Sequence, residues 1–141
     1  MTIEREATPG PRQVFDSYMR LILSNGDVFG TLAADDIVVE MPFALPGRPR
    51  RIAGRDQLIA IASAGREALP VRFDEFRNVV IHDTADPEVI VVEFELAGMI
   101  TTTGRQAAAP FIGVLTVRDG KIARWREYQD TPAMAAALAE R

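Results

Sequence analysis

The sequence predicts an α+β fold in which a few helices cover one face of a curved antiparallel sheet. Segments with helical periodicity dominate the chain up to residue 70, whereas β-rich segments follow one another over residues 71–129. Two of the later segments flank Asp119-Gly120, which is the strongest short hairpin signal in the chain. The expected element order is therefore α-α-β-α-β-β-β-β-α.

The first helix is expected over residues 12–24, after a flexible N-terminal arm formed by residues 1–11. The arm contains two prolines and a glycine and lacks apolar periodicity. Asn25-Gly26 supplies residues that tolerate the left-handed conformation in which helices often end. The apolar residues of this helix recur at helical spacing, at Val14, Tyr18, Leu21 and Ile22.

A short second helix, a strand and a third helix are expected next. Asp27 is placed to cap a helix over residues 28–33, and residues 37–41 form a β-rich run that ends before a proline. Residues 47–51 are expected to form a basic loop. Residues 55–65 again show apolar residues at helical spacing.

The second half of the chain is expected to form two hairpins and a final helix. The strands are expected over residues 71–82, 88–98, 107–118 and 121–129, with turn-forming sequences inside each pair. Pro132 and the alanine-rich stretch after it predict a C-terminal helix. Because nothing divides these elements, residues 12–141 are expected to form a single domain.

Composition and charge exclude several kinds of site. The formal charge is −4 and basic residues are scattered, so no basic stripe is available to a nucleic-acid backbone. Without cysteine, and with His82 as its one histidine, the chain offers no thiolate or histidine cluster for a metal. It contains no glycine-rich nucleotide motif and no apolar run long enough to cross a membrane. We therefore expect a cytoplasmic protein that uses no metal or cofactor and binds neither nucleic acid nor membrane.

Several short motifs accompany the element order: Ala34-Asp35-Asp36-Ile37, Pro42-Phe43, Gly54-Arg55-Asp56, Arg118-Asp119-Gly120-Lys121-Ile122 and Trp125-Arg126-Glu127-Tyr128-Gln129-Asp130. Together they resemble the SnoaL-like branch of the nuclear-transport-factor-2-like superfamily, whose fold is also called cystatin-like. The superfamily includes ketosteroid isomerases, polyketide cyclases and limonene epoxide hydrolases, so the resemblance leaves the activity open. It implies a cone-shaped cavity between sheet and helices, and a homodimer formed through the outer sheet face.

Trp125 and Glu127 are the leading site candidates. Alternation along the last strand places both on one face, where they are expected to line the cavity. An apolar cavity disfavours the charged form of a carboxylate, which raises its pKa toward values useful for proton transfer. In the limonene epoxide hydrolases, a Trp-Arg-Asp-Tyr run has a water-activating carboxylate at the position of Glu127. The alternative is a glutamate that faces solvent or pairs with a neighbouring cation.

Glu40 and Met41 precede a proline at the end of the first strand. The epoxide hydrolases carry a water-holding amide before the same Met-Pro pair, and this resemblance implies that Glu40 faces the cavity across from Glu127. The ketosteroid isomerases carry their catalytic aspartate where this chain has Met41, so that base is missing. Alternation allows one of Glu40 and Met41 to line the cavity, unless the strand bulges.

Glu93 and Glu95 share one face of the strand over residues 88–98. Two carboxylates at this spacing stand close enough to hold a proton between them and to act as an acid. The alternative is an ion pair, because the expected hairpin places Arg77 opposite Glu93. The epoxide hydrolases carry an Arg-x-Asp pair on this strand, and its arginine is absent here.

The remaining candidates are aromatic or apolar. Tyr18 either packs in the core or directs its hydroxyl at a substrate from the apolar face of the first helix. The expected pocket walls, which alternatively belong to the core, are Met41, Phe43, Met99 and Phe111.

These residues favour a cofactor-independent enzyme that performs acid/base chemistry on a small apolar molecule such as a polyketide or terpenoid. Glu127 is expected to be the principal base or acid, and Trp125 to shape the site. Glu40, or the pair Glu93 and Glu95, would complete the proton transfer. Isomerisation, cyclisation and hydration of an epoxide or alkene all fit these groups. The alternative is a non-catalytic ligand-binding or assembly module with the same fold.

Overall fold

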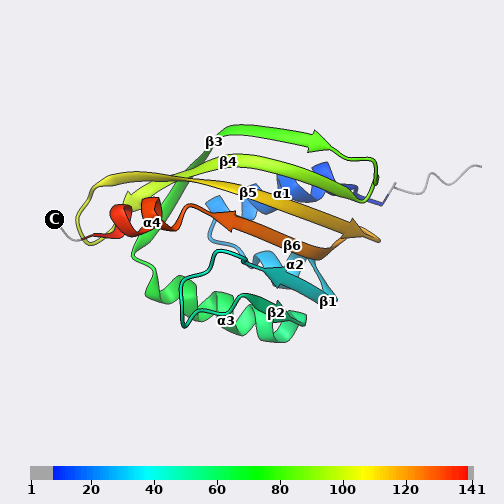
Figure 1. The fold of residues 1–141 in the computed structure, drawn as a ribbon, viewed down its shortest axis with the longest axis horizontal. Coiled ribbons are helices and arrows are strands. Elements are labelled where there is room, and N and C mark those ends of the chain that lie inside the picture. Colours follow the sequence, from blue (N-terminus) through cyan, green and yellow to red (C-terminus); the bar gives the residue numbers. More distant parts are fainter. Residues whose placement is uncertain (1–7, 140–141) are drawn as a thin grey trace, which may run out of the picture.

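The protein folds around one six-stranded sheet (Figure 1). The structure is a computed structural model, and it describes residues 8–139. Its elements are α1 (Pro11–Leu23), α2 (Val28–Leu32), β1 (Ala33–Glu40), β2 (Arg51–Ala53), α3 (Arg55–Ala68), β3 (Val71–Asp83), β4 (Val89–Ile100), β5 (Gln106–Arg118), β6 (Lys121–Gln129) and α4 (Thr131–Leu138). The α+β class is confirmed. Most of the expected N-terminal arm lies outside the described residues.

The sheet is open, and its strands are not all antiparallel. The strand order is β2-β1-β6-β5-β4-β3, so β2 and β3 form the two edges. Strands β3 to β6 pair antiparallel with their neighbours as predicted, but β1 runs parallel to β6. The curved sheet is therefore antiparallel as predicted except at this one pair. Parallel pairing requires a long crossover, and no local turn signal marks it in the sequence.

The short edge strand β2 was not predicted. It begins at Arg51, the last residue of the basic loop that was expected over residues 47–51. Ile52 lies opposite Val39 of β1 and is 3% exposed, whereas both of its neighbours are exposed. A single buried residue between two exposed ones is too short a pattern to predict a strand.

Helix α1 covers one face of the sheet, which we call the inner face, and contacts β3, β4 and β5 (Figure 1). It buries Val14, Phe15 and Tyr18. The helix ends as predicted, because Asn25 adopts a left-handed conformation with φ of 60° and the Gly26 amide donates a hydrogen bond of 2.8 Å to the Leu21 carbonyl. This fixed end positions Tyr18 against the sheet.

The two predicted hairpins are present, and their registers contain irregularities. Asp119 and Gly120 have φ angles of 52° and 75° and form the tight turn between β5 and β6. In the β3–β4 hairpin, the register shifts between Arg77 and Val80, so Arg77 lies opposite Glu95 instead of Glu93. The predicted ion pair between Arg77 and Glu93 was therefore wrong, because hairpin counting does not detect a bulge.

The core lies between α1 and the inner face of the sheet. Alternate residues of β4, β5 and β6 point toward it, and the largest fully buried side chains are Phe15, Ile37, Leu115, Ile122 and Val92. Each buried aliphatic or aromatic side chain of this size contributes about 1.5–3 kcal/mol of transfer free energy. Within residues 8–139, no helix is both long and apolar enough to cross a membrane.

Candidate functional site

Strand β6 carries the candidate site on its inner side. Trp125 lies opposite Leu115 of β5 and is 4% exposed, so its side chain belongs to the core face. Glu127 follows two residues later on the same face, opposite Gly113, and is half-buried. The sequence-based placement of Trp125 and Glu127 on one face is therefore confirmed.

Gly113 provides the space that the Trp125 indole occupies. A Cβ atom at position 113 would lie 2.5 Å from Cη2 and 2.8 Å from Cζ2 of Trp125, which is closer than van der Waals contact allows. A glycine inside a strand often marks such a close approach. Gly113 was not among the predicted site residues, although its place in the middle of a β-rich segment was the available signal.

Tyr18 reaches the site from α1. Its ring lies against the indole of Trp125 with centroids 5.2 Å apart, and against the ring of Phe15 at 5.9 Å. Burial, and to a lesser extent the negative charge of Glu127, raise the pKa of the Tyr18 hydroxyl. Tyr18 is therefore a core residue and a neighbour of the Glu127 charge, and its hydroxyl stays protonated.

The Glu127 carboxylate is held by neutral neighbours. The side-chain amide of Gln129 donates a hydrogen bond of 2.7 Å to Oε2 of Glu127, and its Nε2 lies 3.8 Å from Sδ of Met41. Burial raises the pKa of Glu127, while hydrogen bonds from Gln129 and Trp125 act in the opposite direction. Gln129 was absent from the predicted site. We refer to Tyr18, Trp125, Glu127 and Gln129 as the Glu127 site.

Glu40 does not join this site. Glu40 lies on β1, opposite Arg126 of β6. Its neighbour Val39 is buried on the inner face, so Glu40 points to the outer face of the sheet. Nε of Arg124 donates a hydrogen bond of 2.6 Å to Oε1 of Glu40, and Nη2 of Arg126 lies 3.4 Å from the same oxygen. The hydrogen bond from Arg124 is the main cause that lowers the pKa of Glu40. The structure thus places Glu40 in an ion pair across the sheet from Glu127.

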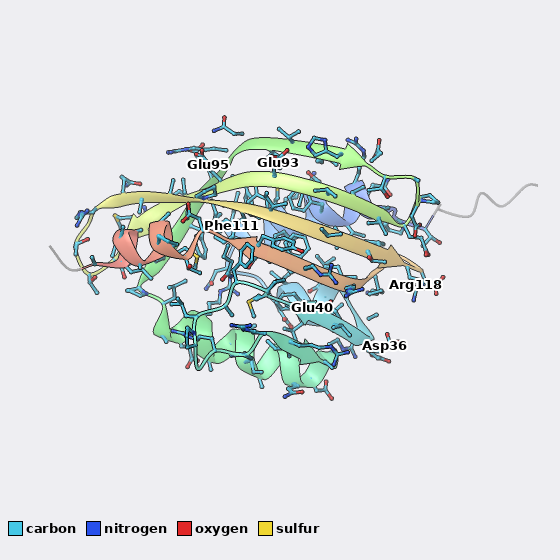
Figure 2. All side chains as sticks on the ribbon, viewed as in Figure 1. Asp36, Glu40, Glu93, Glu95, Phe111 and Arg118 are labelled. Atoms are coloured by element: carbon cyan, nitrogen blue, oxygen red, sulfur yellow. The ribbon has the colours of Figure 1, made fainter. Side chains whose placement is uncertain are left out.

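Glu93 and Glu95 also lie on the outer side of the sheet, along β4 (Figure 2). Their neighbours Val92 and Phe94 are buried on the inner face. Oε2 of Glu93 lies 2.6 Å from Nε2 of His82, and Glu95 lies opposite Pro110. The structure therefore separates both carboxylates from Glu127 by the thickness of the sheet.

The four expected pocket walls occupy different surroundings. Met41 packs against the core beside Gln129. Phe43 is 61% exposed, and its ring contacts Tyr128 with centroids 5.4 Å apart. Met99 alternates with inward-facing neighbours and so belongs to the outer row of β4. Phe111 stacks on Phe94 at 5.4 Å on the inner face and lines a cavity beneath α4.

Metal binding finds no support in the geometry of residues 8–139. Within that range, no group of three or more histidine, aspartate or glutamate side chains converges on one point. The side chains that do converge on the Glu127 site are a carboxylate, a phenol, an amide and an indole. Such a set can transfer a proton and donate hydrogen bonds without a metal ion.

The fold and the Glu127 site define a small α+β protein in which a half-buried carboxylate and a buried tyrosine meet on an aromatic inner face. The chain belongs to the SnoaL-like family, because the model of the SnoaL-like domain matches residues 16–125. This confirms the family that the sequence motifs resemble.

The chain is also similar to individual proteins in sequence or in fold. The chain is 37% identical over 109 residues to an uncharacterized PhzA/B-like protein of Pseudomonas aeruginosa, and the match covers 76% of this chain and 75% of that protein. The crystal structure of a proposed isomerase from Bacillus subtilis is similar with a TM-score of 0.81 and 23% identity, over 90% of this chain and 91% of that one. A proposed polyketide cyclase from Pseudomonas putida has a TM-score of 0.72 and 17% identity, over 93% and 99% of the two chains. Both structures support the fold alone.

Proposed function

We propose that the protein is a cofactor-independent acid/base enzyme, of the isomerase or cyclase type, that acts on a small and mostly apolar carbonyl compound. One arrangement supports this proposal. The Glu127 carboxylate and the Tyr18 ring both lie against Trp125, and among residues 8–139 Glu127 is held by Gln129 and Trp125 and not by a cation. A half-buried carboxylate with a raised pKa and no cationic partner is a candidate for proton transfer.

Glu127 would act as the base. Its carboxylate removes a proton from the carbon next to the substrate carbonyl, and the C–H electron pair moves toward the carbonyl to form an enolate. Because burial raises the pKa of Glu127, it is a stronger base than an exposed glutamate. The protonated Glu127 then returns the proton to a different carbon, which completes an isomerisation and restores the carboxylate.

Tyr18 would stabilise the enolate oxygen. Its pKa is raised by burial and by the charge of Glu127, so it remains a hydrogen-bond donor at neutral pH. A donor that is already fixed where negative charge develops stabilises a transition state without reorganisation of water. Cyclisation would begin with the same deprotonation, and in a hydration reaction Glu127 would instead activate a water molecule.

Deuterium exchange tests the proposal without knowledge of the natural substrate. The probe is 3-cyclohexen-1-one in D₂O, and NMR follows both deuterium incorporation next to the carbonyl and conversion to the conjugated ketone. We expect the wild-type protein to accelerate both over buffer, and Glu127→Gln to lose about 100-fold of that acceleration. Tyr18→Phe should lose about tenfold or more.

Glu93→Gln is the matched control, because it removes a carboxylate from the outer face, where Glu93 pairs with His82. It should keep the wild-type rate. The exchange rate should also rise with pH, with a midpoint above the ordinary glutamate pKa of about 4.3. A Glu127→Gln protein that exchanges as fast as the wild type would refute the role of Glu127.

A ligand-binding module without turnover is the second candidate function. It is favoured by the outward placement of Glu40 and Glu93, which leaves the predicted partners of Glu127 engaged with Arg124, Arg126 and His82. In that case the ketone would change the fluorescence of Trp125 on binding, but no deuterium would be incorporated. The same sample therefore distinguishes the two functions.

A further inference from the structure

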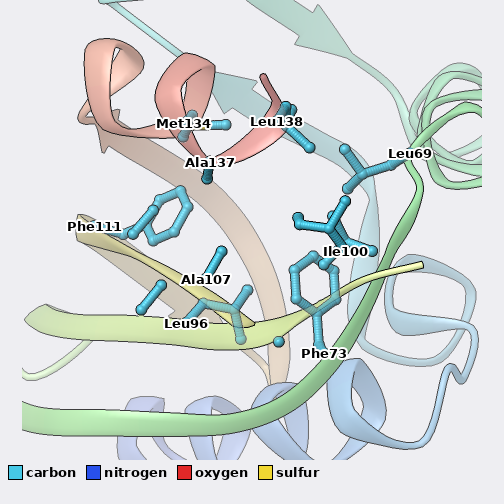
Figure 3. Close-up of a pocket in the computed structure, with 13 residues that line it drawn as sticks. Leu69, Phe73, Leu96, Ile100, Ala107, Phe111, Met134, Ala137 and Leu138 are labelled. Atoms are coloured by element: carbon cyan, nitrogen blue, oxygen red, sulfur yellow. The ribbon is translucent and has the colours of Figure 1, made fainter. Parts of the chain in front are cut away.

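A separate cavity lies beneath α4, between this helix and the ends of β3, β4 and β5 (Figure 3). We call it the α4 cavity. Its volume is about 90 Å³. Side chains from four elements and from the segment before β3 surround it, including Leu69, Phe73, Leu96, Ile100, Phe111 and Leu138.

The lining of the α4 cavity is entirely apolar. Among residues 8–139, every residue that lines it is an aliphatic, aromatic, methionine, alanine or glycine residue, and Ala137 points into it from α4 (Figure 3). A charged group placed here would lose its hydration, and these lining side chains would offer it neither an opposite charge nor a hydrogen bond in return. The lining therefore favours an uncharged, apolar occupant.

Phe111 connects the α4 cavity to the Glu127 site. Its side chain lines the cavity, and across the β5–β6 pairing it lies opposite Gln129, whose amide holds the Glu127 carboxylate. The Phe111 ring also stacks on Phe94, with an interplanar angle of 18°. An occupant of the cavity that contacts Phe111 is thus one strand away from Gln129, which holds the Glu127 carboxylate.

The dimensions of the cavity limit what it can hold. An engineered apolar cavity of roughly 150 Å³ in another protein binds benzene. The α4 cavity is smaller, at about 90 Å³, so it suits a short alkyl chain or a single ring that protrudes from it. A fused-ring molecule would have to displace α4. None of the residues of α4 is fully buried, so the helix is held by few contacts.

We propose that the α4 cavity binds the uncharged, apolar end of the substrate, a single ring or a short alkyl chain, while the reacting end extends past Phe111 to Glu127. The assignment of the reacting end rests on the proposed acid/base function. The assignment of the apolar end rests on the cavity alone. Binding and turnover can therefore be tested separately.

The binding test uses ¹⁹F NMR of two probes that share a ring, 4-fluorotoluene and 4-fluorobenzoate. We expect 4-fluorotoluene to bind at least about tenfold more tightly than the carboxylate, because none of the side chains that line the cavity within residues 8–139 is cationic. Ala137→Leu should weaken 4-fluorotoluene binding by about tenfold or more, since the longer side chain fills the cavity. Ala107→Leu should do the same from the β5 wall.

Ala136→Leu is the matched control, because it makes the same change at the residue just before Ala137. Ala136 is exposed and does not line the cavity. It should bind 4-fluorotoluene as the wild type does. Equal weakening in Ala136→Leu and Ala137→Leu, equal affinity for the two probes, or no binding of 4-fluorotoluene would each overturn the proposal. Glu127→Gln should retain binding, so a loss of turnover with intact binding concerns the proposed chemistry alone.

Discussion

A methyl group at Gly113 tests how tightly the Glu127 site is packed. The Cβ atom of Gly113→Ala would lie 2.5 Å from Cη2 of Trp125, whereas ordinary contact begins at 3.4 Å, so the indole must move by about 1 Å. The rings of Tyr18 and Phe15 resist this movement, with centroids 5.2 and 6.5 Å from that of Trp125. Overpacking of a core typically costs about 1–3 kcal/mol. We expect Gly113→Ala to lower the free energy of unfolding by about 2 kcal/mol, which corresponds to a decrease of roughly 6 °C in Tm.

Urea unfolding measured by tryptophan fluorescence is the assay, because Trp125 is the single tryptophan of the chain. Gly65→Ala on α3 is the control, since no heavy atom lies within 4 Å of the added Cβ. Replacing a glycine inside a helix should stabilise the protein by about 0.5–1 kcal/mol. If Gly113→Ala unfolds at the wild-type urea concentration while Gly65→Ala is stabilised, the close packing of Gly113 against Trp125 is refuted.

Charge and surface variants test other parts of the structure. Burial raises the folded-state pKa of Glu127, so its charged form destabilises the fold increasingly as the pH rises above the unfolded value of about 4.3. Glu127→Gln should therefore be more stable than the wild type at pH 7 in urea unfolding, with a difference that vanishes toward pH 4. The pKa of Glu40 is lowered by Arg124, so its stabilisation is present above about pH 4.3 and is lost as the pH falls through the folded value. Glu40→Gln should cost up to about 1 kcal/mol at pH 7 and nothing in acid, and an equal cost at both pH values would contradict the ion pair. We also propose a homodimer through the outer sheet face, where Val80 and Ile112 are 45% and 43% exposed on either side of β4. Sedimentation should then show a dimer for the wild type and a monomer for Ile112→Glu, and a monomeric wild type would reject it.

The strand pattern predicted the faces of some candidates better than their roles. Glu93 has the apolar neighbours Val92 and Phe94, and alternation between apolar and charged residues is the signal of a strand with one solvated face. The outward placement of Glu93 was thus predictable from its own segment. The spacing of Glu93 and Glu95 alone predicted a proton-sharing pair, whereas the apolar residues between and beside them indicate that their shared face is the solvated one.

Glu40 illustrates a limit of a different kind. Its partners Arg124 and Arg126 lie on β6, far along the chain, and they reach Glu40 because β1 pairs parallel with β6. Alternation describes one strand at a time, so it does not reveal which strand will be the neighbour. A cation supplied by such a pairing decides whether a carboxylate is an ion-pair partner or a base, and here it makes Glu40 the former.

The face that Glu127 occupies was predictable from its own strand, as for Glu93. Its surroundings were not, because part of them comes from a distant segment of the chain, as for Glu40. Strand β6 carries polar residues on both faces, so alternation alone does not identify its inner side, and the large apolar surface of Trp125 was the feature that did. Tyr18 comes from a helix at the other end of the chain, and Gln129 follows two residues after Glu127 on the same face. The resulting carboxylate has neutral hydrogen-bond partners instead of the arginine that Glu40 has. Burial raises the pKa of Glu127 against the weaker opposing effect of its neutral partners, whereas the hydrogen bond from Arg124 lowers the pKa of Glu40. This contrast is the physical reason to expect chemistry at Glu127 and not at Glu40.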